Sequence, residues 1–277
     1  DFLREIDRVY SDGYEVVTCY RNSKNYGDNW ISAGYALWFL REARYLNGAR
    51  MALGSSCAVS GTGFLFSDAV LRECGGWNFF LLTEDIEFTI HNAAHGVKIG
   101  YAANAVLYDE QPTGFCQSWR QRLRWSKGYL QVFRRYGGAL FAGIFRGSFS
   151  CYDMAMNIMP AAVLTGTSVV VNVGAAVSRF VSGGSMAALG ISVLQTLLSL
   201  YLTLFILGAI TTATEWKSIH CTERKKLLYA FTFPLFMLTY LPICIASLFM
   251  RVEWKPIRHE RAMTLDQIKS TALRTPQ

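Results

Sequence analysis

Residues 83–87 read Thr-Glu-Asp-Ile-Glu, and residues 121–125 read Gln-Arg-Leu-Arg-Trp. The first stretch predicts a helix over 83–94, because Thr83 can serve as its N-cap and the acids that follow complement the helix macrodipole. The second lies on a predicted basic and aromatic helix over 118–136. Each alone has an ordinary structural explanation, since acids often cap surface helices and a basic amphipathic helix can lie on a membrane. Their occurrence together, in this order, instead indicates one functional site.

Hydrophobic spacing and turn residues predict the other elements of the first half of the chain. The expected helices are 1–11, 29–46 and 67–71, and the expected strands are 14–20, 64–66 and 97–107. Asp28 is the expected N-cap of the helix over 29–46, and Ser67 is the expected N-cap of the helix over 67–71.

The second half of the chain is strongly apolar. Of the 277 residues, 52% are hydrophobic and 17% are charged, whereas an average soluble domain has about 25% charged residues. Apolar segments near 155–178, 187–211 and 228–249 are each about long enough to cross a bilayer. We therefore expect a soluble domain over 1–136, an interfacial connector over 137–154, a transmembrane region over 155–250 with about three helices, and a basic tail over 251–277.

The distribution of basic residues predicts an orientation in the membrane. The loop over 217–226 is basic and should be cytosolic, together with the soluble domain. A third full crossing would then place the basic tail outside, against the positive-inside rule. Pro234 and Pro242 allow the third segment to be broken or re-entrant, which would return the tail to the cytosol. We expect a multi-pass protein of the cell membrane with a cytosolic catalytic domain.

Composition also argues against several classes of protein. The net charge is +7, but the basic residues do not form one periodic face with interleaved aromatics, so no nucleic acid partner is expected. An anionic membrane leaflet or a phosphorylated substrate explains the excess equally well. The seven cysteines form no Cys-x-x-Cys pair and are expected as free thiols. His91 and His95 have zinc-ligand spacing, but no acid lies between them, so the metalloprotease pattern fails.

Side-chain chemistry suggests what residues 121–125 could bind. The Arg124 guanidinium suits diphosphate oxygens. Trp125 offers a flat face for a sugar ring, and Gln121 can bond a hydroxyl or phosphate. These three side chains occupy neighbouring positions on the predicted helix.

The two stretches, with Gly75-Gly76-Trp77 before them and membrane segments after them, resemble the processive family 2 glycosyltransferases. These include cellulose, hyaluronan and poly-N-acetylglucosamine synthases. The resemblance covers about residues 50–136, and the membrane half is similar in architecture only. It implies an α/β domain of GT-A type, of which this chain would hold the C-terminal half. It further implies an inverting transfer of a sugar from a nucleotide-sugar donor, with uridine the expected nucleoside, to a growing polysaccharide.

The resemblance also implies roles for individual residues. Asp85 matches the general base that takes the proton of the acceptor hydroxyl, and Glu84 a helper or structural acid. The expected substrate-binding residues are Gln121, Arg124, Trp125, Thr83 and the loop Gly61-Thr62-Gly63. The family's metal-binding Asp-x-Asp motif is absent. We expect the ligands of a divalent metal, Mg or Mn, and most of the uridine pocket to lie upstream of residue 1, with no metal ligand in this fragment.

Two alternatives remain open at this stage. A non-processive transferase that makes one addition to a lipid-linked or other single acceptor would use the same chemistry, although residues 121–125 favour processivity. A membrane transporter or scaffold is a different class, and the apolar segments lack the mid-span charges of most transport pathways. The expected partners are thus a nucleotide-sugar donor, a glycan or lipid-linked acceptor, and membrane lipids.

Overall fold

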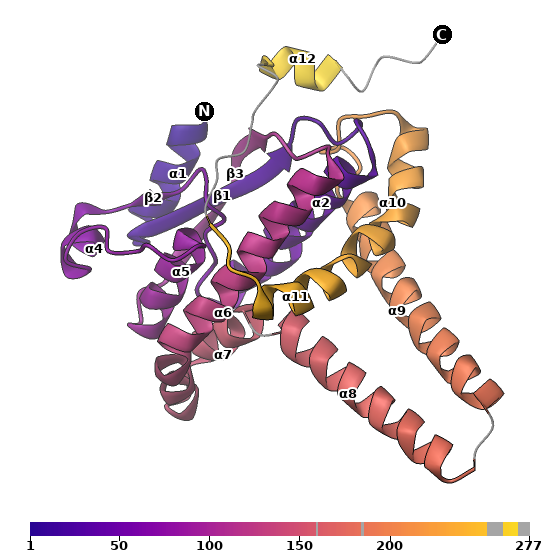
Figure 1. The fold of residues 1–277 in the computed structure, drawn as a ribbon. Helices are drawn as coiled ribbons and strands as arrows, with labels where there is room; N and C mark the ends of the chain where they lie inside the picture. Colours follow the sequence, from indigo (N-terminus) through magenta and orange to yellow (C-terminus); the bar gives the residue numbers. More distant parts are fainter. Residues whose placement is uncertain (159, 184–185, 254–262, 271–277) are drawn as a thin grey trace.

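The computed structural model describes the whole chain except residues 159, 184–185, 254–262 and 271–277 (Figure 1). In the described residues, a mixed three-stranded sheet has the order β2–β1–β3. Its strands are β1 (Val16–Ser23), β2 (Leu65–Phe66) and β3 (Ile99–Asp109). β1 pairs in parallel with β3 and antiparallel with β2, so β1 and β3 end at the same edge. All three strands lie near their predicted positions.

The helices of the first half surround this sheet. They are α1 (Phe2–Ser11), α2 (Trp30–Arg41), α3 (Gly48–Ala52), α4 (Asp68–Glu73), α5 (Glu84–Ala94), α6 (Phe115–Phe145) and α7 (Phe149–Ile158). A π-helical turn over Glu42–Asn47 joins α2 to α3.

One prediction about this half, the N-cap of α2, needs correction. Asp28 does not cap α2: Asn29 is extended, and its side chain accepts hydrogen bonds from the backbone N–H groups of Ile31 and Ser32 at 3.0 and 3.1 Å. The connector predicted over 137–154 is largely helical, because α6 continues to Phe145 and α7 packs back against it. The Ser67 cap is confirmed, since its hydroxyl accepts from the Val70 N–H. All seven cysteines are free, as predicted.

The alternation of side chains along β1 divides the core into two parts. Val17 and Cys19 face α1, where they pack with Ile6 and Val9. Val16 and Tyr20 belong to the larger cluster on the other face, which includes Leu37 and Leu40 of α2 and Phe233 further along the chain. Helix α2 is therefore buried between the sheet and the second half of the chain.

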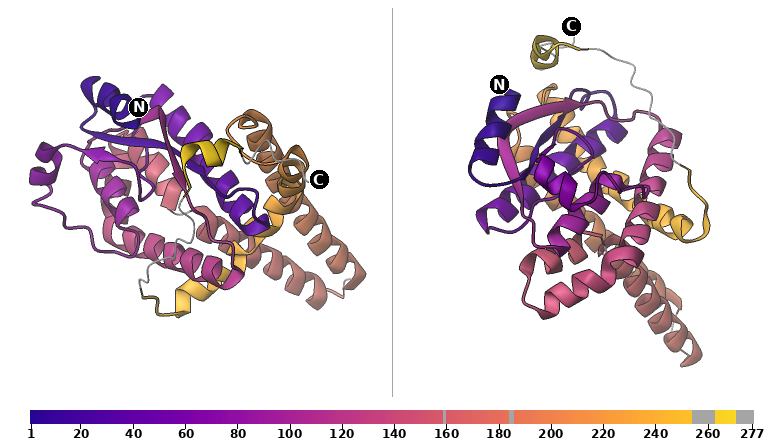
Figure 2. Two further views of the ribbon diagram at one scale, coloured as in Figure 1. Left: turned by 90° about the horizontal axis from the view of Figure 1, so that it is seen from above. Right: turned by 90° about the vertical axis from the view of Figure 1, so that its left-hand side faces the viewer.

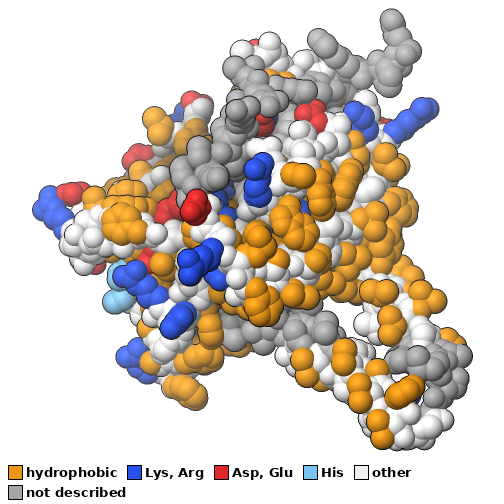
Figure 3. All heavy atoms as spheres, viewed as in Figure 1, with side chains coloured by type: hydrophobic (Ala, Val, Ile, Leu, Met, Phe, Trp, Pro, Cys, Tyr) orange, Lys and Arg blue, Asp and Glu red, His pale blue; other side chains and the backbone are white. Residues whose placement is uncertain are grey.

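The second half of the chain is helical: α8 (Pro160–Val181), α9 (Met186–Thr214), α10 (Glu223–Leu238), α11 (Tyr240–Phe249) and α12 (Leu265–Ser270). Helices α8 and α9 project together from the rest of the molecule (Figures 1 and 2). Their surface is largely hydrophobic (Figure 3), with Val170, Phe180 and Leu194 among the most exposed residues.

Among the described residues, two helical stretches are long and apolar enough to cross a membrane, Val193–Thr214 and Glu223–Phe249. The first predicted segment, 155–178, contributes a shorter apolar stretch, Val170–Val181. The expected three apolar segments are therefore present as helices, and among the described residues two of them meet both the length and the hydropathy of a membrane span.

The third apolar segment is interrupted between its two prolines. α10 ends at Leu238 and α11 begins at Tyr240. α11 packs against the first half of the chain, where Lys127 donates to the Ser247 carbonyl oxygen at 2.9 Å. This agrees with the predicted broken segment. Residues 254–262, which hold much of the predicted basic tail, lie outside the described residues.

The loop between α9 and α10 is attached to the sheet edge. Asn22 donates to the Ser218 carbonyl oxygen at 2.9 Å, and Lys225 donates to the Gly27 carbonyl oxygen at 2.7 Å. The Tyr108 hydroxyl lies 3.1 Å from Nε2 of His220, within hydrogen-bond distance. The basic loop thus lies on the same side as the first half of the chain.

Candidate functional site

The two sequence stretches that indicated a site are in direct contact. Arg124 of α6 donates to the Leu82 carbonyl oxygen, and the Leu82 N–H donates to Gln131 at 3.3 Å. The Thr83 side chain fills a notch over Gly128, where a Cβ would lie 2.5 Å from its hydroxyl oxygen. Helix α6 therefore fixes the turn that precedes α5.

Thr83 does not act as predicted at the start of α5. It occupies the N-cap position, but within the described structure its side chain makes no capping hydrogen bond. The residue is 2% exposed and its side chain packs on α6. Thr83 therefore positions the turn, and its side chain is not open to a substrate.

Asp85 lies beside the predicted acceptor loop. Its Oδ1 accepts from the Ile86 N–H at 2.8 Å, and its Oδ2 would be 3.1 Å from a Cβ at Gly61. Gly61 and Gly63 have φ angles of 75° and 62°, which non-glycine residues rarely adopt. At Gly63 a Cβ would also collide with the Cys19 sulfur, at 2.5 Å. The loop over 61–63 can therefore approach both the sheet and Asp85 closely.

The surroundings of Asp85 change its acidity. The pKa of Asp85 is raised to about 6, mainly by burial and also by the charge of Glu84. The hydrogen bond from the Ile86 N–H and the charges of Arg21 and Arg124 oppose this rise. A carboxyl group with a pKa close to neutral can be ionised at physiological pH and still accept a proton efficiently. This is a suitable state for a general base.

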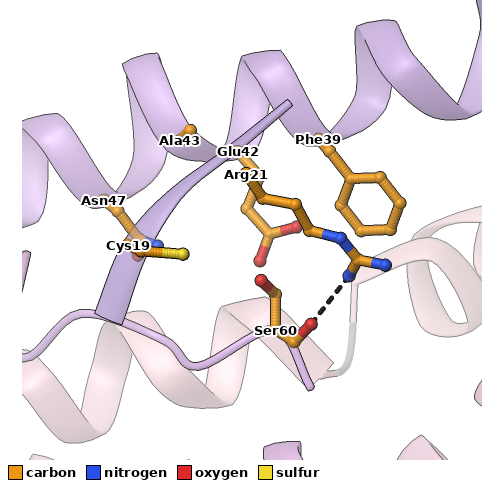
Figure 4. Close-up of a pocket in the computed structure, with 7 residues that line it drawn as sticks. All are labelled: Cys19, Arg21, Phe39, Glu42, Ala43, Asn47 and Ser60. Atoms are coloured by element: carbon orange, nitrogen blue, oxygen red, sulfur yellow. Dashed lines mark hydrogen bonds between the residues drawn. The ribbon is translucent and has the colours of Figure 1, made fainter. Parts of the chain in front are cut away.

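Arg21 at the end of β1 connects several parts of the site, and sequence reasoning missed it. Its guanidinium donates to the Ser60 carbonyl oxygen at 2.7 Å, forms an ion pair with Asp109 at the end of β3, and lies 3.7 Å from the centre of the Phe39 ring. Figure 4 shows Arg21 directed past Phe39 toward Ser60. A charged residue at the carboxyl end of a parallel strand was the available signal.

The predicted binding residues of α6 have different surroundings. Gln121 has a buried side-chain oxygen with no hydrogen-bond partner in the described part of the chain. The Trp125 ring meets Tyr35 and Phe39 edge-on, at centroid distances of 5.7 and 6.0 Å. Arg122, between them, is fully buried and faces α10 and α11. The structure thus connects Trp125 through Phe39 to Arg21, and Arg124 through Leu82 to the turn before Asp85.

The acids around Asp85 are not equivalent. Glu84 is partly exposed, and its charge raises the pKa of Asp85. Glu87 is fully buried, pairs with Arg135 at 2.9 Å and accepts from the Leu81 N–H at 2.9 Å. Glu87 therefore lies in the first turn of α5, as expected, and its side chain also joins α5 to α6.

Metal-ligand groups are not gathered at this site. Within the described ranges, the structure has no group of three or more His, Cys, Asp or Glu side chains that could hold a metal ion. The ring centroids of His91 and His95 are 4.2 Å apart, but no third ligand from the described residues joins them. The residues present do not fit a bound divalent metal, and the expected Mg or Mn stays a prediction.

The fold places a partly buried carboxylate, Asp85, beside a glycine-rich loop at the edge of a mixed sheet. Residues 1–128 match the family model described as "Glycosyltransferase like family 2". Residues 1–128, just under half of the chain, are thus similar to the family 2 glycosyltransferases.

Curated relatives are similar over parts of the same region. The probable glycosyltransferase YdaM of Bacillus subtilis is 30% identical over 83 residues, which is 30% of this chain and 20% of that protein. The beta-monoglucosyldiacylglycerol synthase of Synechocystis is 30% identical over 92 residues, which is 33% of this chain and 19% of that protein. The synthase of the same name from Trichormus variabilis is 26% identical over 128 residues, which is 46% of this chain and 26% of that protein. The matched segments span about a fifth to a quarter of these relatives' own lengths.

Proposed function

We propose that the whole protein is a membrane-bound, inverting glycosyltransferase of GT-A type that transfers a sugar from a nucleotide-sugar donor to a lipid acceptor. The observation that carries the proposal is the Asp85 carboxylate, held beside the Gly61 loop with a raised pKa. The family match over residues 1–128 supplies the reaction class.

The mechanism follows from the position of Asp85. Asp85 takes the proton from an acceptor hydroxyl while that oxygen attacks the anomeric carbon of the donor sugar. The bond from this carbon to the diphosphate breaks, and the nucleoside diphosphate leaves with the bonding electrons. Attack from the face opposite the leaving group inverts the configuration. Arg124 and Gln121 are the side chains proposed to bind the diphosphate, because a guanidinium compensates charge and an amide donates hydrogen bonds.

A lipid acceptor has better support than the processive polysaccharide synthesis expected from residues 121–125. Two of the relatives described above are named for a glucosyldiacylglycerol product. The site also adjoins apolar helices, because Tyr35 packs on both Trp125 and Phe236 of α10. An acceptor held at the membrane surface by its acyl chains could reach Asp85 from this side.

We further propose that α8 and α9 form a hairpin in the cell membrane and that the catalytic domain is cytosolic. The docked α9–α10 loop and its basic residues support this arrangement. The C-terminal part of α6, with α7, would lie at the membrane surface. Phe141, Phe145 and Phe149 are exposed there, next to Arg146, a composition typical of interfacial helices.

Transfer assays on the full-length protein in vesicles test the proposal. Vesicles that contain diacylglycerol and a glycosylated lipid would be incubated with a panel of labelled nucleotide sugars. We expect a lipid-extractable product with one sugar added. A long polymer that stays in the aqueous phase would instead support the polysaccharide synthase.

The variant Asp85→Asn tests the base in the same assay. We expect a loss of transfer of roughly 10²-fold or more, because general base catalysis contributes about 10²–10⁴-fold, while donor affinity stays within a few-fold. Asp12→Asn, at an exposed position after α1, is the matched control. Normal turnover by Asp85→Asn would exclude Asp85 as the base.

A further inference from the structure

A second carboxylate, Glu42, points toward Ser60, the residue that precedes the loop beside the proposed base. It begins the π-helical turn between α2 and α3. With Arg21, Phe39, Asn47 and Ser60 it lines a small pocket. In Figure 4 the Glu42 carboxylate is directed between the Arg21 side chain and Ser60. Single π-helical turns inside helices are frequent at functional sites, and nothing in the two sequence motifs pointed to this residue.

The Glu42 carboxylate has no bonding partner of its own. In the part of the chain that the structure describes, it makes no hydrogen bond and no ion pair. Burial raises the pKa of Glu42, and the charges of Arg50, Arg21 and Arg41 oppose this. The first two arginines are bonded elsewhere, Arg50 to Asp153 and Arg21 to Asp109. Because a partly buried carboxylate without hydrogen bonds costs free energy, Glu42 is not explained by stability.

Glu42 and Asp85 flank the same loop. Ser60 lines the Glu42 pocket, and the next residue, Gly61, is the one that Asp85 approaches. The charge of Arg21 acts on both carboxyl groups. From α6, the Tyr129 phenol is affected by both as well: burial raises its pKa, and the charges of Glu42 and Asp85 add to this. The two carboxylates therefore lie near the same loop, Glu42 beside Ser60 and Asp85 beside Gly61, and both are within electrostatic reach of Arg21 and Tyr129.

We propose that Glu42 binds a second hydroxyl of the acceptor and so orients the attacking hydroxyl toward Asp85. An ionised carboxylate only accepts hydrogen bonds, so its natural ligand is a group with free O–H donors. Asp85 would accept a hydrogen bond from the attacking hydroxyl, and Glu42 would accept one from a neighbouring hydroxyl. Together they favour an acceptor with at least two hydroxyls. The acceptor class is then a glycolipid with a sugar headgroup, in preference to a lipid with a single hydroxyl. This inference rests on the proposed transferase function.

The test compares two acceptors with wild type and Glu42→Gln in the full-length protein. The acceptors are diacylglycerol, with one hydroxyl, and monoglucosyldiacylglycerol, with a sugar headgroup. We expect wild type to prefer the glycolipid by roughly tenfold in kcat/KM, the value of one hydrogen bond to a charged group. Glu42→Gln should remove this preference by raising KM for the glycolipid, with KM for the donor unchanged.

Controls separate this role from a structural one. Glu73→Gln, on an exposed part of α4, should keep the wild-type preference. The thermal stability of Glu42→Gln should equal or exceed that of wild type, because a neutral amide replaces a partly buried carboxylate that has no hydrogen bond in the described structure. A wild-type preference for diacylglycerol, or an equal loss on both lipids, would overturn the inference.

Failure of the lipid proposal would give a different result. Transfer would then occur to a soluble oligosaccharide and to neither lipid. The Glu42 comparison would be repeated with that oligosaccharide against a single-hydroxyl alcohol, and the same change in preference is expected. Its absence would again contradict the role of Glu42.

Discussion

At the scale of single residues, the behaviour of Asp85 depends on groups that the sequence places far away. Ile86 and Glu84 are neighbours in the chain, but Gly61, Arg21 and Arg124 reach Asp85 only through folding. The balance of burial and charge sets the protonation state of Asp85, the proposed base, so pH dependence is the most direct measure of this environment.

We predict that kcat/KM falls on the acid side with an apparent pKa of about 6, the pKa to which burial raises Asp85. Below this pH the carboxyl group is protonated and cannot accept the acceptor proton; above it the base is available. Glu84→Gln should shift the acid limb to lower pH, because the Glu84 charge raises the Asp85 pKa. pH–rate profiles of both proteins between pH 4.5 and 8 measure this. The prediction would be contradicted if the acid limb of the wild-type profile lay near pH 4 and the Glu84→Gln substitution did not shift it.

Residue-level prediction from sequence was uneven for a physical reason. Asp85, Gly61 and Arg124 belong to recognisable motifs, and the structure brings them together. Arg21 and Glu42 belong to no recognisable sequence motif. Their place near the site depends on the loop and the helix that pack beside them in the folded chain. Thr83 has a motif, but its side chain turns toward Gly128.

At the scale of elements, the contact between α5 and α6 is set by one glycine. We predict that Gly128→Ala destabilises the protein by about 1–3 kcal/mol, the usual cost of overpacking, because a Cβ would lie 2.5 Å from the Thr83 hydroxyl oxygen and 2.6 Å from its methyl carbon. Transfer activity should also fall, since this contact positions the turn before Asp85.

Gly138→Ala is the matched control on the same helix. Nothing lies within 4 Å of a Cβ at Gly138, and alanine favours a helix over glycine by about 1 kcal/mol. Thermal unfolding in detergent should therefore show Gly138→Ala at or above wild-type stability and Gly128→Ala below it. Equal effects of the two substitutions would exclude the proposed contact.

The length of α6 illustrates how packing extends an element beyond its local signal. The predicted helix ends at Tyr136, before Gly137 and Gly138, which weaken helices. The observed helix continues to Phe145, because Leu140 packs in one cluster with Cys151, Met154 and Ala155 of α7. Tertiary burial outweighs the local cost.

At the scale of the whole molecule, Arg122 joins the catalytic half to the helices that follow. It is fully buried, donates to the Phe236 carbonyl oxygen at 3.0 Å and to the Thr239 hydroxyl at 2.6 Å, and lies 4.3 Å from the Phe236 ring centre. Arg122 thus binds the chain at the point where α10 ends and α11 begins.

We predict that Arg122→Ala loosens this junction and lowers stability by roughly 2–5 kcal/mol, since a large buried side chain and its hydrogen bonds are lost. Limited proteolysis should cut between α10 and α11 faster than in wild type. Arg120→Ala, at an exposed position of α6, should leave the cleavage rate unchanged. Unaltered protection in Arg122→Ala would contradict the role of this side chain.

The arrangement of the helices also predicts the topology in the membrane. An epitope inserted after Gly183, in the turn that follows α8, should be reached by antibody from outside intact cells. A tag in the loop near Ser218 should be reached only after permeabilisation, because this loop is bound to the catalytic half. Labelling of both sites from the same side would exclude a membrane-crossing α8–α9 hairpin.

The sequence by itself determined the two-part organisation, most helices and strands, the paired motifs and the interruption of the third apolar segment. These depend on local signals: periodicity, caps, prolines and the contrast between charged and apolar stretches. Only the tertiary structure decided that Asp85 lies beside Gly61, that Arg21 and Glu42 face the same space, and that Arg122 binds α10. Such contacts join residues far apart in sequence, and they are selected by how whole elements fit together, which no local pattern records.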